Sequence, residues 1–311
     1  MKIVTGWRGL DTADRGAAVA IGNFDGVHKG HQAVLEAARQ AAARLGVPAA
    51  AAVFSPHPRN VFQPDAPPFR LMTDRLRAET LAEQGMQILY VIPFDKDFSR
   101  LSDAIFAQGV LADGLGARHV VVGADFRFGK GRAGDAARLA QLGERLGFGV
   151  TAVAPVGGAQ AYSSTLVREA LRAGDCAAAA AILGRPWTAD GEVQRGQALG
   201  RTYGFPTANL ELGSLLRPRF GIYAVRARLD GAGPWLPGAA NVGVRPTVNG
   251  VGDLLEVFLL DWEGDLYGRR MDVQFIRFLR DEAKFDSLEA MAAQIVRDVA
   301  DCRTILDGAS Q

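Results

Sequence analysis

The first half of the chain alternates between short apolar runs and longer segments rich in Ala, Leu, Arg and Glu, from residue 17 to about residue 183. The apolar runs are AAVAIG, PAAAAVF, ILYVIPF, HVVVG and GVTAVAP. This alternation predicts strand–helix crossover units that build a parallel sheet. Because the runs show no polar alternation, we expect both faces of this sheet to be covered.

The pattern changes after the segment AAAAAILGRPW. Between residues 191 and 280, turns rich in Gly, Pro and Asn separate the runs GEVQRGQ, GIYAVRARLD, AANVGVR, LLEVFLLD and MDVQFIRFLR. Short strands at this spacing predict an antiparallel barrel or sandwich. We expect a boundary near residues 184–188, with an α/β domain over residues 1–185 and a β domain over residues 186–311.

The end of the second domain is expected to be a helix. Asp286, with Glu289 three residues later, is its expected N-terminal cap. The apolar residues that recur at helical spacing on one face are Leu288, Met291, Ile295, Val299, Cys302 and Leu306.

Composition and charge narrow the class of partner. With 48% apolar and 22% charged residues among 311, the chain is typical of a globular protein. Its net charge of +1 gives no broad surface for nucleic acid, so small-molecule partners are expected. Cys176 and Cys302 lack metal-ligand spacing and are expected to be apolar fillers in a reducing compartment. No run approaches the roughly 18 apolar residues of a membrane span, so we expect a cytoplasmic protein without membrane partners, and leave a homo-oligomer open.

The turn GNFDGVHKGH follows the first long apolar run and leads into an alanine-rich helical pattern. A turn between a buried strand and a helix exposes backbone N–H groups, which bind anions readily. Gly22, Gly26 and Gly30 allow close backbone approach, and His28 and His31 are spaced so that both rings can face one phosphate. A metal-binding pair or two solvent-facing histidines are the alternatives.

The string FDGVHKGH resembles the motif of the adenylyl- and cytidylyltransferase superfamily, whose members act on the α-phosphate of a nucleoside triphosphate. The resemblance implies a Rossmann-like nucleotidyltransferase domain, with His28 and His31 as catalytic residues. It also implies a second phosphate-binding segment, found here in YSSTLVREAL, where Arg168 is catalytic. A capped helix with a surface arginine is the alternative for this segment. The residues expected to bind ATP in this domain are Gly22, Phe24, Asp25, Gly30, Ser163, Ser164 and Thr165.

Two further stretches, FSPHPRNVF and VGADFRFGKGRAGD, resemble the flavin-adenylylating branch of this superfamily. Phe62 and Phe128 would supply apolar surface for a planar flavin ring, and His57 and Asp125 would orient it. Family members often carry Asn at the position of Asp125, and Asp lacks the amide donor. Buried aromatic side chains of the core are the alternative for both phenylalanines.

In the second half, FPTANL resembles the riboflavin kinase motif, which implies that Thr207 and Asn209 bind Mg²⁺ and the phosphates of ATP. Gly196, Gly200 and Gly204, which precede it, are expected to line the ATP site, although turn residues of a barrel are the alternative. The resemblance also assigns Glu256, in LLEVFLLDWEGDLYG, as the base that activates a flavin hydroxyl. A solvent-facing glutamate is the alternative.

In order along nearly the whole chain, these motifs resemble the prokaryotic bifunctional riboflavin kinase/FAD synthetase family. The resemblance implies an antiparallel β-barrel kinase domain with a terminal helix, and the conversion of riboflavin to FMN and of FMN to FAD. ATP is the co-substrate of both steps, and Mg²⁺ is the expected cofactor. The alternatives are one retained activity, a flavin-binding regulator, or adenylylation of a pantetheine or pyridine nucleotide derivative.

Overall fold

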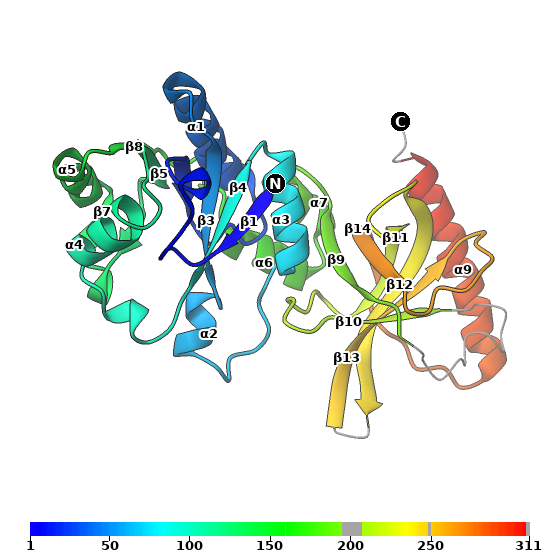
Figure 1. Cartoon of the computed structure of the whole chain (residues 1–311). Helices are drawn as coiled ribbons and strands as arrows, with labels where there is room; N and C mark the ends of the chain where they lie inside the picture. The colour runs from blue at the N-terminus through cyan, green and yellow to red at the C-terminus, as the bar shows by residue number, and fades with distance from the viewer. Residues whose placement is uncertain (159, 195–206, 248–249, 309–311) are drawn as a thin grey trace. The chain divides into compact units, whose positions relative to one another are not determined.

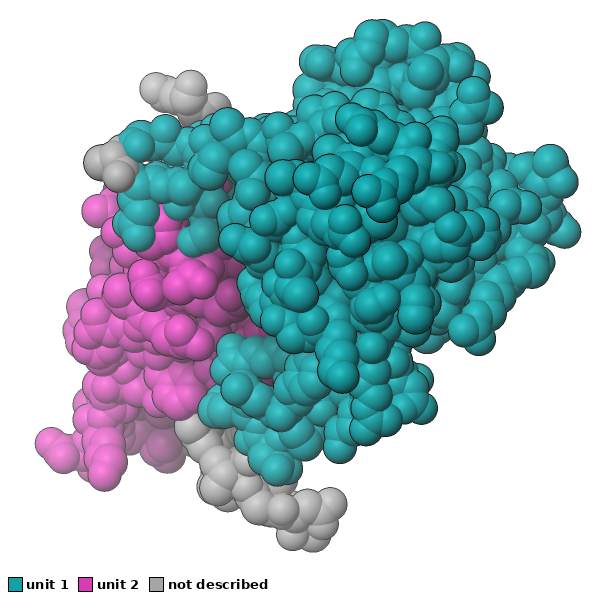
Figure 2. Space-filling model, turned by 90° about the vertical axis from the view of Figure 1, so that its left-hand side faces the viewer, with its two compact units in different colours: residues 1–67, 74–163 teal, residues 68–73, 164–311 magenta. Residues whose placement is uncertain are grey.

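The computed structural model covers residues 1–311 and describes residues 1–158, 160–194, 207–247 and 250–308. The chain forms two compact units (Figures 1 and 2). The first unit comprises residues 1–67 and 74–163. The second comprises residues 68–73 and 164–311.

The first unit is built on the predicted parallel sheet. Its strand order is β1-β4-β3-β2-β5-β8, and every neighbouring pair is parallel. All four residues of β2 are buried, which confirms the expectation of a strand covered on both faces. The strands are β1 (Lys2–Thr5), β2 (Ala18–Ile21), β3 (Ala49–Ser55), β4 (Ile88–Pro93), β5 (His119–Gly123) and β8 (Gly149–Val153).

The sheet of the first unit is accompanied by helices and by short local elements. Helix α1 contacts β2, β3 and β5, so it covers the centre of the sheet. The α-helices of this unit are α1 (Lys29–Leu45), α2 (Pro58–Phe62), α3 (Asp74–Glu83), α4 (Asp103–Ile105) and α5 (Ala136–Leu146). The other elements are the 3₁₀ helices Thr12–Asp14, Phe98–Arg100 and Lys130–Arg132, the π-helix Phe106–Ala112, and the paired strands β6 (Arg127–Phe128) and β7 (Gly134–Asp135).

The second unit contains the predicted antiparallel barrel. Its strand order is β10-β13-β12-β11-β14-β9, with every neighbouring pair antiparallel. A bridge between Gln194 and Asn209, whose N–H···O distance is 2.8 Å, links the two edges of this sheet. The strands are β9 (Trp187–Glu192), β10 (Ala208–Glu211), β11 (Gly221–Leu229), β12 (Leu236–Thr247), β13 (Gly250–Leu259) and β14 (Arg270–Arg280).

The terminal helix α9 (Leu288–Gly308) is present, but its cap and its packed face differ from the expectation. The Ser287 hydroxyl, and not Asp286, accepts the backbone N–H of Ala290, because a short hydroxyl directly before the helix reaches the free amides of its first turn. Cys302 and Leu306 pack against the outer face of the barrel, whereas Leu288 is 55% exposed. The second half of the helix therefore makes the main apolar contact.

The compact units divide the chain after Ser163, whereas the sequence analysis divides it at residue 185. The segment between these points forms α6 (Ser164–Ala173) and α7 (Cys176–Leu183). Their apolar side chains Val167, Leu171 and Leu183 share one core with the barrel strands. The strap 68–73 belongs to the same unit: the Trp187 indole N–H donates to the Leu71 carbonyl at 2.7 Å.

The two cysteines behave as expected of small buried residues. Both are free thiols, and each packs within a core of the second unit. Burial raises the pKa of the Cys176 and Cys302 thiols to about 12. A thiol with such a pKa is a poor nucleophile near neutral pH, so these side chains serve packing.

Candidate active sites

The turn between β2 and α1 has an unusual backbone that is held in place by burial. Phe24 and Val27 have left-handed φ angles of 49° and 44°, which non-glycine residues seldom adopt. Their side chains are 1% and 0% exposed, so packing against the core maintains this conformation. Gly22 begins the turn with an N–H bond to the Ala52 carbonyl, and Asp25 within it is 2% exposed.

His28 and His31 form one stacked pair at the start of α1. Their ring centroids are 3.6 Å apart, with an angle of 22° between the planes. His28 caps the helix, because its Nδ1 accepts the backbone N–H of His31 at 3.3 Å. An accepting Nδ1 carries no proton, so a neutral His28 carries its N–H on Nε2. The pair therefore offers a ring donor at a helix N-terminus, where an anion is stabilised.

Gly30, the third glycine of the turn, lies too close to its neighbours for a larger residue to fit without displacement. A Cβ at this position would lie 3.1 Å from the His28 ring and 3.3 Å from the Tyr162 carbonyl oxygen. The Lys29 ammonium lies 5.7 Å from the centre of the Tyr162 ring. The segment that begins YSST thus reaches the start of α1 through Tyr162, which directly precedes Ser163 in the same unit.

The rest of the segment that is expected to bind phosphate lies in the second unit, at the start of α6. Ser164 is half-buried and Thr165 is exposed. Arg168 donates from Nε to the Phe69 carbonyl at 2.8 Å, and its guanidinium lies 5.4 Å from the centre of the Phe69 ring. Because the histidine pair is in the other unit, its convergence with these residues stays a prediction.

Two residues around the histidine turn were missed by the sequence analysis. Arg77 in α3 is 2% exposed, forms an ion pair with Asp74 at 2.8 Å, and donates to the Asn23 carbonyl at 3.3 Å. The Asn23 amide oxygen is buried and has no hydrogen-bond partner among the described residues. A buried arginine in an otherwise ordinary helical sequence gives no signal of its own, since its hydrogen bond to the turn goes to the backbone carbonyl of Asn23.

The residues expected to bind flavin follow β3 and β5 at the carboxyl edge of the sheet. His57 caps the short helix α2 by accepting the Arg59 N–H at 3.1 Å, and Phe62 at the end of this helix is 60% exposed. Asp125 is exposed beside Gly123. Phe128 is only 6% exposed, so its ring chiefly packs in the core, and a flavin contact there stays a prediction.

A chain of aromatic rings links these positions. The centroid distance is 6.0 Å from Phe62 to Phe94, 5.5 Å from Phe94 to Phe98 and 5.4 Å from Phe106 to Phe128. Phe54 joins the same cluster. These additional rings give no signal in the sequence, because Phe54 lies in β3 whereas Phe94, Phe98 and Phe106 follow β4, and they come together only when the sheet forms.

In the second unit, Glu256 lies in a row of polar residues on the outer face of the barrel. Leu255 and Val257 point into the core, so Glu256 between them points outward. The strand register places Asn209 of β10 opposite Glu256 on one side and Asn241 of β12 opposite it on the other. Directly opposed residues share a face, with Cβ atoms about 5 Å apart.

The side-chain oxygens of this row and of nearby Thr207 are of the kind that binds Mg²⁺. Asn209 is 6% exposed, and its amide oxygen is buried without a hydrogen-bond partner among the described residues. Thr207, two residues earlier, is half-buried. Amide and hydroxyl oxygens are the hard donors that Mg²⁺ prefers, so the donor set fits this ion. Gly196, Gly200 and Gly204 lie outside the described residues.

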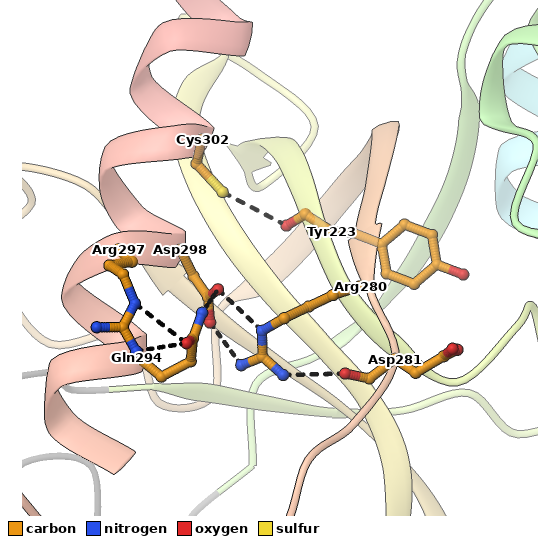
Figure 3. Close-up of polar contacts among 7 residues, drawn as sticks. All are labelled: Tyr223, Arg280, Asp281, Gln294, Arg297, Asp298 and Cys302. Carbon is orange, nitrogen blue, oxygen red and sulfur yellow. Dashed lines mark hydrogen bonds and ion pairs between the residues drawn. The ribbon is translucent and has the colours of Figure 1, made fainter. Parts of the chain in front are cut away.

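A network of polar contacts joins α9 to the end of β14 (Figure 3). Arg280 at the end of β14 forms a bidentate ion pair with Asp298 of α9, with N···O distances of 2.9 and 2.6 Å. Hydrogen bonding to Asp298 raises the pKa of Arg280, and Gln294 donates to the same carboxylate at 2.8 Å. Arg280 also donates to the Asp281 carbonyl, which ties the segment after β14 to the helix.

Comparison with known proteins gives matches over both halves of the chain. Residues 10–166 match the family model described as FAD synthetase, and residues 183–306 match that described as riboflavin kinase. The bifunctional riboflavin kinase/FMN adenylyltransferase of Pseudomonas fluorescens is 45% identical over 307 residues, which cover 98% of each chain. The protein of the same name from Escherichia coli K12 is 41% identical, with 96% of each chain covered.

A similar solved structure also spans almost the full length. It is a macrolide-efflux protein from Streptococcus pneumoniae, with 29% identity and a TM-score of 0.86, and the match covers 97% of this chain and 99% of the other. Within the ranges that the present structure describes, no helix is both long enough and apolar enough to cross a membrane.

Proposed function

The chain belongs to the family of bifunctional riboflavin kinase/FMN adenylyltransferases, and from this premise we propose how its residues divide two reactions. The enzyme phosphorylates riboflavin to FMN with ATP, and then transfers an adenylyl group from ATP to FMN, which yields FAD and pyrophosphate. The observation that supports both activities is that one chain matches both family models, one after the other. We assign adenylyl transfer to residues 1–185 and the kinase reaction to residues 186–311.

In adenylyl transfer, an FMN phosphate oxygen attacks the α-phosphorus of ATP, and the bond from this phosphorus to the bridging oxygen of the β-phosphate breaks. No protein nucleophile is needed. The Nε2–H of His28 and the stacked His31 ring stabilise the charge that develops on the α-phosphate. Backbone N–H groups at Ser163, Ser164 and Thr165, with Arg168, hold the departing pyrophosphate.

The flavin of this reaction binds beyond the carboxyl ends of β3 and β5. The exposed Phe62 ring provides the apolar contact, and His57 and Asp125 orient the polar edge of the ring system. Phe128, whose ring contacts Phe106 and Phe126, completes the apolar part of this flavin site. Phe24, Gly22, Asp25 and Gly30 shape the turn that receives ATP.

In the kinase reaction, Glu256 accepts the proton of the terminal ribityl hydroxyl of riboflavin as its oxygen attacks the γ-phosphorus of ATP. The bond from this phosphorus to the bridging oxygen of the β-phosphate breaks, and ADP leaves. Thr207 and Asn209 would hold Mg²⁺, which neutralises phosphate charge when it is bound. The orphaned amide oxygen of Asn209 next to Glu256 supports this assignment. We propose that adenylyl transfer also needs Mg²⁺.

The proposal is tested by a time course with purified protein, riboflavin, ATP and Mg²⁺, from which the three flavins are separated. FMN is expected to rise and then fall as FAD forms. A parallel reaction without Mg²⁺ should form neither product. Accumulation of FMN alone would indicate a single retained activity, and the absence of both products would indicate a binding protein. Competition with a pantetheine phosphate and a pyridine mononucleotide tests the acceptor.

Two predictions about the protein in the cell have their own measurements. A cytoplasmic location is tested by cell fractionation. A homo-oligomer is tested by sedimentation at several protein concentrations, since self-association raises the apparent mass as concentration rises.

A further inference from the structure

Asn241 is the neighbour of Glu256 that the assignments above leave without a role. In the register of β12 and β13 it lies directly opposite Glu256, on the side away from Asn209. The outer face of the barrel thus carries three adjacent polar side chains, with the proposed base in the middle. Outward-facing residues of the next row, Ala239 and Phe258, are apolar and pack against α9. The polar row is therefore a local departure from the packing of this face.

The two ends of the Asn241 amide have different surroundings. Its Nδ2 lies 3.5 Å from the point that a Cβ of Gly243 would occupy, and the Glu282 carboxylate fills the same space. Its Oδ1 is buried and has no hydrogen-bond partner among the residues that the structure describes. A buried amide oxygen that accepts no hydrogen bond destabilises a protein, so a position of this kind calls for a donor from a ligand.

The donor is identified by the geometry of the row. Asn209, on one side of Glu256, belongs to the proposed Mg²⁺ and ATP contacts. The other substrate of the same reaction carries a ribityl chain, in which further hydroxyl groups adjoin the one that is phosphorylated. When the terminal hydroxyl is at Glu256, these neighbouring hydroxyls must extend away from ATP. The side of the row that faces away from Asn209 is that of Asn241.

We propose that Asn241 Oδ1 accepts a hydrogen bond from an inner ribityl hydroxyl of riboflavin, and that this bond holds the terminal hydroxyl at Glu256. The inference rests on the proposed role of Glu256 as the base. It makes Asn241 a substrate-binding residue that recognises the sugar-alcohol chain and not the flavin ring. Ile222, the next residue in the row, is apolar and marks the end of the polar strip.

The test uses the full chain with Asn241→Val, which removes the amide and suits a strand. In assays of FMN formation, the KM for riboflavin should rise about tenfold, the loss expected for one hydrogen bond to a buried partner. The inhibition constant of lumiflavin, which has the flavin ring and no ribityl chain, should not change. The KM for ATP and the formation of FAD from supplied FMN should also be unchanged.

The matched control is Gln274→Val, which replaces an amide by the same residue on β14, opposite Thr188 and Arg226 and away from the row. This variant should keep all kinetic constants. Thermal unfolding should show that Asn241→Val is at least as stable as the wild type, because an unpaired buried oxygen has been removed. If it does not fold, Asn241→Ala replaces it in the same assays.

Three outcomes would overturn the inference: an unchanged riboflavin KM, an equal rise in the lumiflavin constant, or a parallel loss of ATP affinity and thermal stability. The proposed function fails in a different way. It is wrong if the wild type forms no FMN, or if Glu256→Gln forms FMN at the wild-type rate. With FMN formed by the wild type and lost in Glu256→Gln, an unchanged riboflavin KM in Asn241→Val contradicts the role of Asn241 alone.

Discussion

At position 28, one imidazole both caps a helix and carries the proposed donor to phosphate. The spacing of His28 and His31 was enough to predict an anion site, because residues three apart lie on one helix face. It was not enough to predict that the rings stack or which nitrogen of His28 carries the proton. These features depend on the bond from the His31 N–H to Nδ1, and on a turn whose buried Phe24 and Val27 adopt left-handed angles. The motif therefore predicts the chemistry, and the packing of the turn determines how the two rings are arranged.

The close approach at Gly30 gives a prediction for a single methyl group. In Gly30→Ala the added Cβ must displace the His28 ring or the Tyr162 carbonyl by a few tenths of an ångström. We expect FAD formation from FMN to slow by about tenfold, since misplaced catalytic groups lose rate steeply. FMN formation from riboflavin should be unchanged, and both rates are measured by flavin separation.

The control for this change is Gly109→Ala in the same unit, where a Cβ meets nothing within 4 Å. It should leave both rates at the wild-type level. Equal rates of FAD formation in the two variants would show that the tight packing around Gly30 has no role in the reaction.

At the scale of elements, the sequence predicted most of the strands of both sheets and was less successful with the faces that the elements bury. The apolar stripe of α9 was expected to begin at Leu288, which is in fact 55% exposed. Asp298 is buried instead, because Arg280 pairs with it from the end of β14. Strand β1 was also missed, since KIVT is short and only one of its residues is buried. Each failure involves a partner that is distant in sequence, which periodicity does not report.

Helix α3 supports the histidine turn through Arg77, whose loss should therefore destabilise the first unit. Arg77→Ala removes the donor to the Asn23 carbonyl and leaves a void around a side chain that is 2% exposed. We expect the free energy of unfolding to fall by about 2 to 3 kcal/mol, measured by urea denaturation. The loss of stability is not expected to be larger, because the side chain of the ion-pair partner Asp74 is 64% exposed and water can solvate its charge once Arg77 is removed.

Arg75→Ala on the same helix is the control. Its ion pair with Glu79 is a surface pair at 2.7 Å, with side chains 23% and 46% exposed, and its loss should cost less than about 1 kcal/mol. Similar losses for the two variants would mean that the buried position of Arg77 adds nothing to the stability of the turn.

For the whole molecule, the change from βα alternation to short strands predicted two domains in the right order and with the right architecture. Which segments of the chain belong to the second unit was not predicted. Its core includes α6 and α7, and the strap 68–73 joins it through a contact between residues 116 apart, Trp187 and Leu71. Alanine-rich helices such as α7 carry no sequence signal for which of two cores they pack against.

The position of α6 and α7 predicts that a fragment cut at the expected boundary will be unstable. The fragment 186–311 lacks five buried residues of the barrel core, which the fragment 164–311 retains. These are Val167, Leu171, Cys176, Ala179 and Leu183. At roughly 1 kcal/mol or more for each buried side chain, the shorter fragment should be less stable by about 4 kcal/mol or more. Both fragments lack the strap, so urea denaturation of the two compares the helices alone; equal midpoints would contradict this role.

The central claim is that one chain runs two reactions at separate sites. Its most direct measurement is the ratio of FMN to FAD that the full-length His28→Ala/His31→Ala variant forms from riboflavin, ATP and Mg²⁺, after circular dichroism has shown that the variant is folded. The account predicts FMN formation at the wild-type rate and FAD formation at least about a hundredfold slower, because the donors to the reacting phosphate are gone. The reciprocal variant, Glu256→Gln, should form FAD only from supplied FMN. Loss of both products in the folded histidine variant, or FAD formation at the wild-type rate, would contradict the account.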